Sequence, residues 1–127
     1  MKKILFIFAL VLFCAACGQK NEKSDYEKYD KVDILIFTQQ GCSHCEKAMD
    51  FINNRLKVKN PKLTVEQIDV SYDSENIKIL KEYLHKYDFK ENTIGTPIII
   101  FNKQLVMGWD LQNKVKLQRA FEFNRED

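Results

Sequence analysis

The segment Gly41-Cys42-Ser43-His44-Cys45 constrains this chain most, because it stands where a strongly apolar stretch gives way to a predicted helix. Cys42 and Cys45 are the only cysteines beyond position 17. The two residues between them bring both sulfurs within reach of a disulfide on the first helical turn. A Cys-x-x-Cys pair between a strand and a helix is typical of a centre for thiol–disulfide exchange.

The start of that helix favours a thiolate at Cys42. Its first backbone N–H groups have no partner inside the helix, and the helix dipole is positive at this end. Because the thiolate is the nucleophile, we expect Cys42 to attack and Cys45 to resolve the mixed disulfide.

Two other interpretations of the cysteine pair stay open, a permanent disulfide and half of a zinc site. Zinc needs two further ligands, and His44 lies too close between the cysteines to serve easily as one. A haem attachment site would need histidine at position 46, where the chain has Glu46. We therefore expect no resident metal.

The length of 127 residues indicates one domain with a modest core. The formal charge of +2 comes from Lys2 and Lys3, and the rest of the chain carries 18 basic and 18 acidic side chains. A neutral domain with dispersed charges gives no reason to expect nucleic acid as a partner.

Residues 1–16 have the pattern of a secretory signal peptide. A charged start, Met1-Lys2-Lys3, precedes an apolar run that begins at Ile4. Even when it is carried through Ala16, this run is shorter than the roughly 20 residues that span a bilayer.

The leader ends in Ala15-Ala16-Cys17, and small residues directly before a cysteine resemble the signal of a bacterial lipoprotein. The resemblance implies cleavage before Cys17, which becomes the lipidated N-terminus and anchors the chain to a membrane. Ordinary secretion with cleavage near Ala16 and an uncleaved N-terminal anchor are the alternatives. All three place the domain outside the cytoplasm, where disulfide chemistry is in demand. The lipoprotein signal implies a location in the cell envelope, anchored to a membrane and facing the periplasm or the exterior.

Residues 17–31 are predicted to form a flexible, lipid-anchored tether, and residues 32–127 the folded domain. From Gly18 to Lys31 the chain is polar, with mixed charge and no apolar periodicity. A coil of that length has a root-mean-square span of about 20 Å, which would keep the domain near the membrane surface.

The apolar pattern of the domain predicts alternating strands and helices. Residues 32–37 form a nearly continuous apolar run, as expected for a central strand covered on both faces. The helix after Gly41 ends at Asn60-Pro61 and has one apolar stripe, made of Cys45, Ala48, Met49, Ile52 and Leu56. This stripe places Cys45 on the inner face and leaves Cys42 at the exposed tip.

A second strand is predicted over residues 63–70. A helix then follows from an N-cap at Ser74 to about Asp88, with a buried stripe of Ile77, Leu80, Leu84 and Tyr87. His85 lies off this stripe and is expected at the surface.

The last third of the chain predicts a hairpin and a helix. After a loop over residues 89–96, two strands at 97–101 and 105–109 are joined by a short turn. The last helix, from about Asp110 to Phe123, is expected to bury Leu111, Val115, Leu117 or Gln118, and Phe121.

The predicted order β-α-β-α-β-β-α resembles the thioredoxin fold, an α/β fold with a central mixed sheet. The resemblance covers about residues 32–123 and depends on Cys42-Ser43-His44-Cys45, Thr96-Pro97 and Gly108-Trp109. It implies that the Thr96-Pro97 bond is cis, that Pro97 lies against the disulfide, and that this loop holds the substrate backbone, with Ser43 beside it. Gly108 is similar to the glycine that lets this edge approach the site.

The resemblance extends to thioredoxins, glutaredoxins and the oxidising DsbA-like enzymes. His44 matches the Cys-x-His-Cys pattern of the DsbA-like enzymes, and this implies that its ring tunes the Cys42 thiolate. Many thioredoxins carry a buried aspartate where this chain has Ile36, so solvent or another group must move the proton of Cys45.

These features predict an envelope thiol–disulfide oxidoreductase that exchanges disulfides with exported proteins. The expected catalytic residues are Cys42, Cys45 and His44, the oxidising direction is favoured, and no cofactor is required. The expected partners are cysteine-containing exported proteins, an envelope redox partner and the membrane through the anchor, with the domain itself a monomer. The alternative is a non-catalytic module of the same fold that captures copper or a haem-maturation partner through its dithiol.

Overall fold

The structure is a computed structural model that describes residues 27–90 and 95–122. The predicted signal peptide and Cys17 lie outside these residues. Along the chain, the elements are α1 (Glu27–Asp30), β1 (Ile34–Thr38), α2 (Ser43–Phe51), η1 (Ile52–Leu56), α3 (Lys57–Lys59), β2 (Val65–Asp69), α4 (Ser74–Lys86), β3 (Ile98–Phe101), β4 (Gln104–Met107) and α5 (Leu111–Glu122). Within the described ranges, no helix is long and apolar enough to cross a membrane.

The four strands form one sheet in the order β2-β1-β3-β4. β1 runs parallel to β2 and antiparallel to β3, and β3 forms an antiparallel hairpin with β4. The hairpin turns through Asn102 and Lys103, which both have positive φ, as the tightest two-residue turns require. The predicted order of elements and the mixed sheet are therefore confirmed.

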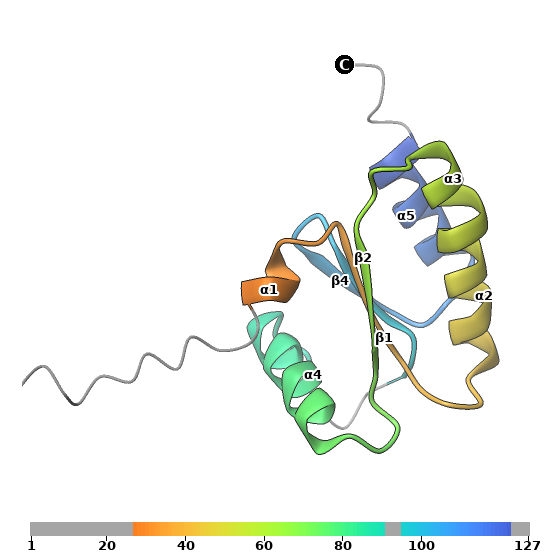
Figure 1. The fold of residues 1–127 in the computed structure, drawn as a ribbon. Helices are drawn as coiled ribbons and strands as arrows, with labels where there is room; N and C mark the ends of the chain where they lie inside the picture. The colour runs from red at the N-terminus through yellow and green to blue at the C-terminus, as the bar shows by residue number, and fades with distance from the viewer. Residues whose placement is uncertain (1–26, 91–94, 123–127) are drawn as a thin grey trace, which may run out of the picture.

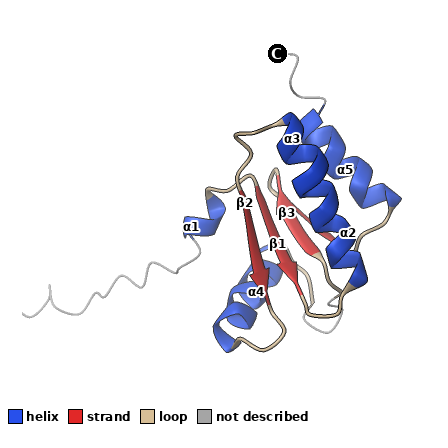
Figure 2. Ribbon diagram, turned by 45° about the vertical axis from the view of Figure 1, so that its right-hand side comes forward, coloured by secondary structure: helices blue, strands red, loops and turns tan. Residues whose placement is uncertain are grey.

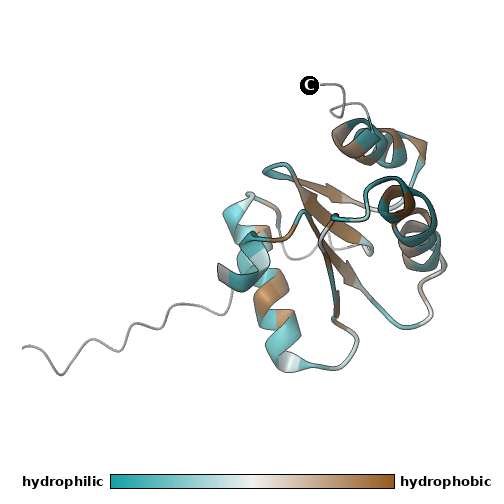
Figure 3. Cartoon of the chain, turned by 45° about the horizontal axis from the view of Figure 1, so that its top comes forward, coloured by the Kyte–Doolittle hydropathy of each residue, from teal (hydrophilic) through white to brown (hydrophobic). Residues whose placement is uncertain are grey.

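Helices cover both faces of this sheet. α4 packs on one face with α1 beside its end, while α2, α3 and α5 lie on the other face (Figures 1 and 2). Leu35 and Phe37 of β1 belong to the apolar cluster under α4, and Ile34 and Ile36 belong to the cluster under α2 and α5. All four side chains are at most 2% exposed. The continuous apolar run thus predicted a two-sided central strand correctly, and the strands form the most apolar layer in Figure 3.

One continuous helical segment, made of α2, η1 and α3, begins at the cysteine pair. Most of its predicted stripe is buried, namely Cys45, Ala48, Ile52 and Leu56, while Met49 is half-buried against the core. The prediction of an ordinary α-helix missed η1, a π-helical turn in which the Lys57 N–H bonds to the carbonyl of Ile52. Such a turn takes in one more residue than an α-helical turn. Phe51 and its neighbour Ile52 both pack into the core there.

The N-cap and the buried face of α4 both differ from the prediction. Its N-cap is Asp73 rather than Ser74, because the Asp73 carboxylate accepts hydrogen bonds from the N–H groups of Glu75 and Asn76, at 2.9 and 3.3 Å. The buried face is Ile79, Leu80, Tyr83 and Leu84. Of the predicted stripe, Ile77 and Tyr87 are only half-buried at its margins.

The segment just before β1 corrects the predicted tether. Residues 27–30 form the short helix α1. Its Tyr29 is half-buried against the α4 cluster, and the Tyr83 hydroxyl donates to the Asp30 carboxylate at 2.7 Å. The packed part of the chain therefore includes residues 27–30, which were predicted to belong to the tether, because Tyr29 and Tyr83 hold this polar turn on α4.

The helix α5 also differs from its prediction. Leu111, expected to be buried, is 77% exposed at the first residue of α5, whereas Asn113 in the same turn faces inward. Leu117 is fully buried, while Val115 and Phe121 are half-buried. Asn113, which no apolar pattern can indicate, is 8% exposed and points inward.

Candidate functional site

The cysteine pair lies directly after the carboxyl end of β1. Gly41, with φ of +72°, provides the left-handed turn into α2, and Cys42 is the residue that caps that helix. Cys42 and Cys45 are joined as a disulfide with a Cα–Cα separation of 5.2 Å, within the usual range for such bridges. Cys42 is half-buried, whereas Cys45 is only 3% exposed. Only Cys42 is therefore accessible to another protein.

The helix end is directed at the accessible sulfur. The backbone N–H of Cys45 donates to Cys42 Sγ at 3.1 Å, so the sulfur takes the place that an oxygen takes in an ordinary N-cap. This is the arrangement of amides expected from the sequence. A negative charge on Cys42 would gain from this hydrogen bond and from the positive end of the helix dipole.

The loop before β3 closes over the same sulfur. The Thr96–Pro97 peptide bond is cis, as the resemblance implied, and Pro97 is buried. The Thr96 carbonyl oxygen lies 3.6 Å from Cys42 Sγ, and the Thr96 hydroxyl lies 3.5 Å from it. Segments 54 positions apart in the sequence thus meet at one atom.

Ser43 and His44 occupy the first turn of α2 and are both exposed. Within the described ranges, no hydrogen bond or ion pair joins the His44 ring to either sulfur. Any influence of His44 on the pair must therefore act through its charge. Ser43 follows Cys42 directly and is exposed beside the accessible sulfur.

Gln39 and Ser71, which the sequence analysis did not single out, hold the loop around Cys42 in place. The Thr96 hydroxyl donates to Gln39 Oε1 at 3.1 Å. The Gln40 N–H donates to the Ser71 hydroxyl at 2.7 Å, which ties the active-site loop to the segment after β2. Hydrogen bonds from the side chain and then the backbone of Ser71 hold the pKa of the Asp69 carboxyl below its usual value.

The turn after β4 borders the site from the other side. Gly108, with φ of +85°, donates its N–H to the Pro97 carbonyl at 2.7 Å. A Cβ added to Gly108 would meet no atom within 4 Å, so the backbone conformation, rather than crowding, requires glycine here. The Asn113 amide donates to the carbonyls of Met107 and Gly108 at 3.0 and 2.9 Å and thereby fixes this turn.

The interior behind Cys45 is apolar. Ile36, at the position of the aspartate found in many thioredoxins, is fully buried and belongs to the same cluster as Ala48 and Ile52. Among the described residues, the buried polar side chains are Thr38 and Asn113, and neither of them ionises. The described interior therefore holds no carboxylate that could exchange a proton with Cys45.

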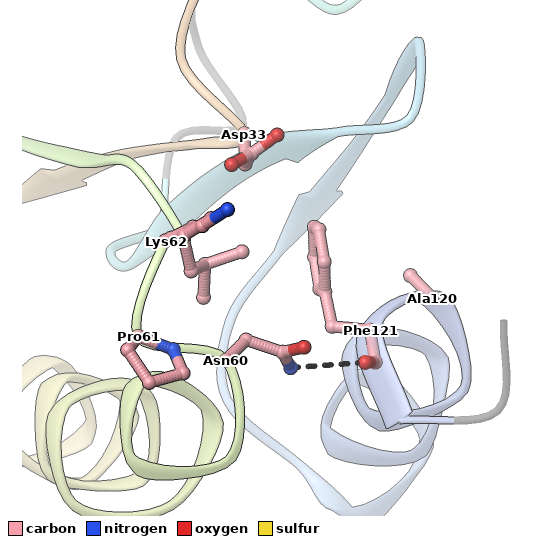
Figure 4. Close-up of a pocket in the computed structure, with 7 residues that line it drawn as sticks. Asp33, Asn60, Pro61, Lys62, Ala120 and Phe121 are labelled. Carbon is pink, nitrogen blue, oxygen red and sulfur yellow. Dashed lines mark hydrogen bonds between the residues drawn. The ribbon is translucent and has the colours of Figure 1, made fainter. Parts of the chain in front are cut away.

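Other hollows and clusters lie away from the disulfide. A hollow of about 580 Å³ is lined by Asn60, Pro61, Leu63 and Phe121, with Asp33 and Lys62 beside them (Figure 4). Asp33 precedes β1, so this hollow lies at the opposite end of the sheet from Cys42. Among the described residues, no group of three or more His, Cys, Asp or Glu side chains is placed to hold a metal ion.

A solved structure has a similar fold. The glutaredoxin from Archaeoglobus fulgidus matches with a TM-score of 0.53 over 79% of this chain and 97% of that chain. The domain has the thioredoxin fold. The two sequences are only 15% identical, so the likeness establishes the fold and leaves the activity to the site. The sequence matches no protein-family model and no curated protein.

The thioredoxin fold explains why these segments meet. The loops after β1 and β4 and the loop before β3 all emerge at one end of the sheet. Cys42, Thr96 and Gly108 each stand on one of these three loops. The sequence-predicted residues Cys42, Cys45, Thr96 and Pro97 are therefore brought together, with Ser43 and His44 at the rim.

Proposed function

We propose that this chain is a protein thiol–disulfide oxidoreductase of the cell envelope, with Cys42 as the exchanging sulfur. The observation that carries the proposal is the Cys42–Cys45 bridge at the start of α2, with one accessible sulfur and one buried sulfur. A purely structural bridge has no need of a helix N–H aimed at one of its sulfurs. A reacting thiolate does, because the same N–H stabilises the charge that appears when the bridge opens.

In the oxidising direction, a thiolate of the substrate attacks Cys42 Sγ. The Cys42–Cys45 bond breaks, and Cys45 leaves with the electron pair as a thiolate. A second thiolate of the substrate then attacks the substrate sulfur in the mixed disulfide, and Cys42 is released. The substrate gains a disulfide and loses two electrons, the domain gains a dithiol, and the protons pass to and from solvent. The reducing direction is the reverse, with Cys42 as the attacking thiolate.

The surrounding residues suggest three supporting roles. The Thr96-Pro97 loop and Ser43 border the accessible sulfur, where they can hold an extended substrate chain. His44, one position before Cys45, would add a positive charge near Cys42 when its ring is protonated. Cys45 exchanges its proton with solvent, since the described interior offers no carboxylate.

Turnover is the direct test of this proposal. The domain should catalyse reduction of a disulfide-bonded model protein by dithiothreitol, and His44→Ala should slow oxidation of a reduced model protein. The Cys42→Ser variant, which leaves the fold's core untouched, is the control and should be inactive. Failure of the wild-type domain to exceed this control would contradict the proposal.

A second measurement separates exchange from metal capture. The reduced domain should be titrated with copper(I) and the stoichiometry followed beside the turnover assay. Tight binding of one copper ion without turnover would favour the alternative function, a non-catalytic module that captures copper through its dithiol. A bridge that is neither reduced nor turned over would favour a permanent disulfide.

The envelope location depends on residues outside the described ranges. We expect Cys17→Ser to abolish lipid attachment, because the sulfur that would carry the lipid is lost, and to release the protein from membranes or leave it unprocessed. Fractionation and mass spectrometry of the mature N-terminus would measure this, with Cys14→Ser as the matched control. An unmodified mature N-terminus in the wild-type protein would exclude lipidation.

A further inference from the structure

We propose that Gln39 is a positioning residue that lowers the reduction potential of the Cys42–Cys45 pair by competing for the Thr96 hydroxyl proton. The inference rests on the proposed exchange at Cys42 and adds a residue that shifts the equilibrium between the disulfide and the dithiol. It starts from a single hydroxyl with two acceptors within reach. Thr96 Oγ1 lies 3.1 Å from Gln39 Oε1 and 3.5 Å from Cys42 Sγ.

A hydroxyl has one proton to donate, so it cannot serve both acceptors well at once. In the disulfide, Cys42 Sγ is a neutral sulfur and therefore a weak acceptor. The amide oxygen of Gln39 is both closer and stronger, and it holds the hydroxyl in this state. Thr96 is half-buried at this point, so water competes only partly for the same proton.

Reduction changes which acceptor is preferred. A partner dithiol is oxidised to a disulfide and supplies two electrons, so that the Cys42–Cys45 bond breaks. Cys42 Sγ becomes a thiolate, Cys45 becomes a thiol with one of the two protons, and the other proton passes to solvent. A hydrogen bond to an ionised acceptor is roughly twice as strong as one between neutral groups. The Thr96 hydroxyl therefore turns toward the sulfur, and its hydrogen bond to Gln39 is lost. Gln39 stabilises the disulfide form only, whereas Thr96 chiefly stabilises the thiolate form.

The two side chains should consequently shift the potential in opposite directions. Removing the Thr96 hydroxyl destabilises the thiolate, so the disulfide becomes harder to reduce and the potential falls. Removing the Gln39 amide destabilises the disulfide, so the potential rises. An effect on folding alone would not produce opposite signs at two residues that contact each other.

The test is the equilibrium of the full chain with glutathione and dithiothreitol buffers at pH 7, which together span a wide range of potentials. Thr96→Val should lower the equilibrium constant for reduction of the Cys42–Cys45 bridge by glutathione about tenfold. This corresponds to a potential lower by about 30 mV for a two-electron couple. Gln39→Ala should raise the same equilibrium constant about threefold, or about 14 mV by the same relation. Thr96→Ser keeps the hydroxyl and should restore most of the wild-type value.

A double variant and a matched control make the test decisive. In the Thr96→Val background, Gln39→Ala should have no further effect, because the shared proton is gone. Gln40→Ala, at the adjacent exposed position, should leave the potential unchanged, since its described contact is made by the backbone N–H. A Gln39→Ala potential at or below the wild-type value, or an equal rise without the Thr96 hydroxyl, would overturn the inference.

The equilibrium uses no protein substrate, so the two proposals can fail separately. A domain with the expected opposite shifts but no turnover would retain this inference and lose the proposed function. A domain that turns over substrates, with Gln39→Ala unchanged in potential, would retain the function and lose the inference. A bridge that no buffer reduces would overturn both.

Discussion

A Cys45→Ser variant is expected to accumulate mixed disulfides with partner proteins through Cys42, while Cys42→Ser accumulates none. Cys42 is the accessible sulfur, and Cys45 is 3% exposed and cannot reach a folded partner. In the proposed mechanism, Cys45 of the wild-type domain resolves the mixed disulfide as a neighbour whose effective concentration is millimolar or higher. Its loss leaves resolution to thiols in solution, so the intermediate persists.

The trapped species can be measured on non-reducing gels and identified by mass spectrometry of the linked peptides. The double variant Cys42→Ser/Cys45→Ser is the control for adventitious oxidation. Equal trapping by Cys42→Ser would show that the two sulfurs are interchangeable. The assignment of attacking and resolving roles would then be wrong.

Phe37→Ala is expected to lower the free energy of unfolding by about 3–5 kcal/mol, the usual cost of removing a buried phenylalanine ring. Phe37 is fully buried, and its ring lies 6.0 Å from that of Tyr83, so it joins β1 to α4. A domain of this size is stabilised by only about 5–15 kcal/mol in total, so the variant should be close to unfolding at physiological temperature.

Urea denaturation of the oxidised domain would measure this loss, with the midpoint falling and the slope unchanged. Val58→Ala is the matched control, because Val58 is 69% exposed and its truncation should change stability by no more than about 0.5 kcal/mol. A loss below about 1 kcal/mol for Phe37→Ala would mean that the β1–α4 contact collapses around the missing ring.

The sequence predicted β1 well because its pattern leaves no choice of face. Residues 34–37 are all apolar, so any strand built from them must be covered on both sides. The cysteine pair was equally clear, since its spacing and its place before a helix are local properties. Thr96-Pro97 was found through resemblance to a known fold rather than through its own chemistry.

The orientation of α4 could not be predicted from its own residues. Apolar or aromatic side chains occur at positions 77, 79, 80, 83, 84 and 87, which allow two overlapping stripes. In the structure the face with Ile79 and Tyr83 is buried, and the Tyr83 hydroxyl donates to Asp30, 53 positions earlier in the chain. Periodicity within a helix contains no information about such a partner.

The same limit applies to Gln39 and Asn113 in the site. Gln39 acts through Thr96, 57 positions away, and a polar residue in a turn before a helix usually only faces water. Asn113 satisfies two backbone carbonyls in the turn after β4, so its burial depends on the path of that turn. A residue whose role is to hydrogen-bond a distant segment has no pattern in the adjacent sequence that would indicate that role.

The place of α1 sets how far the start of the described chain lies from the disulfide. α1 contacts α4 just before β1 begins, and the cysteine pair follows the far end of that five-residue strand. At about 3.3 Å per residue, the strand separates the point of attachment from the disulfide by roughly 17 Å. A tether that joins the domain at α1 would therefore enter at the end of the sheet opposite Cys42 and leave the accessible sulfur uncovered.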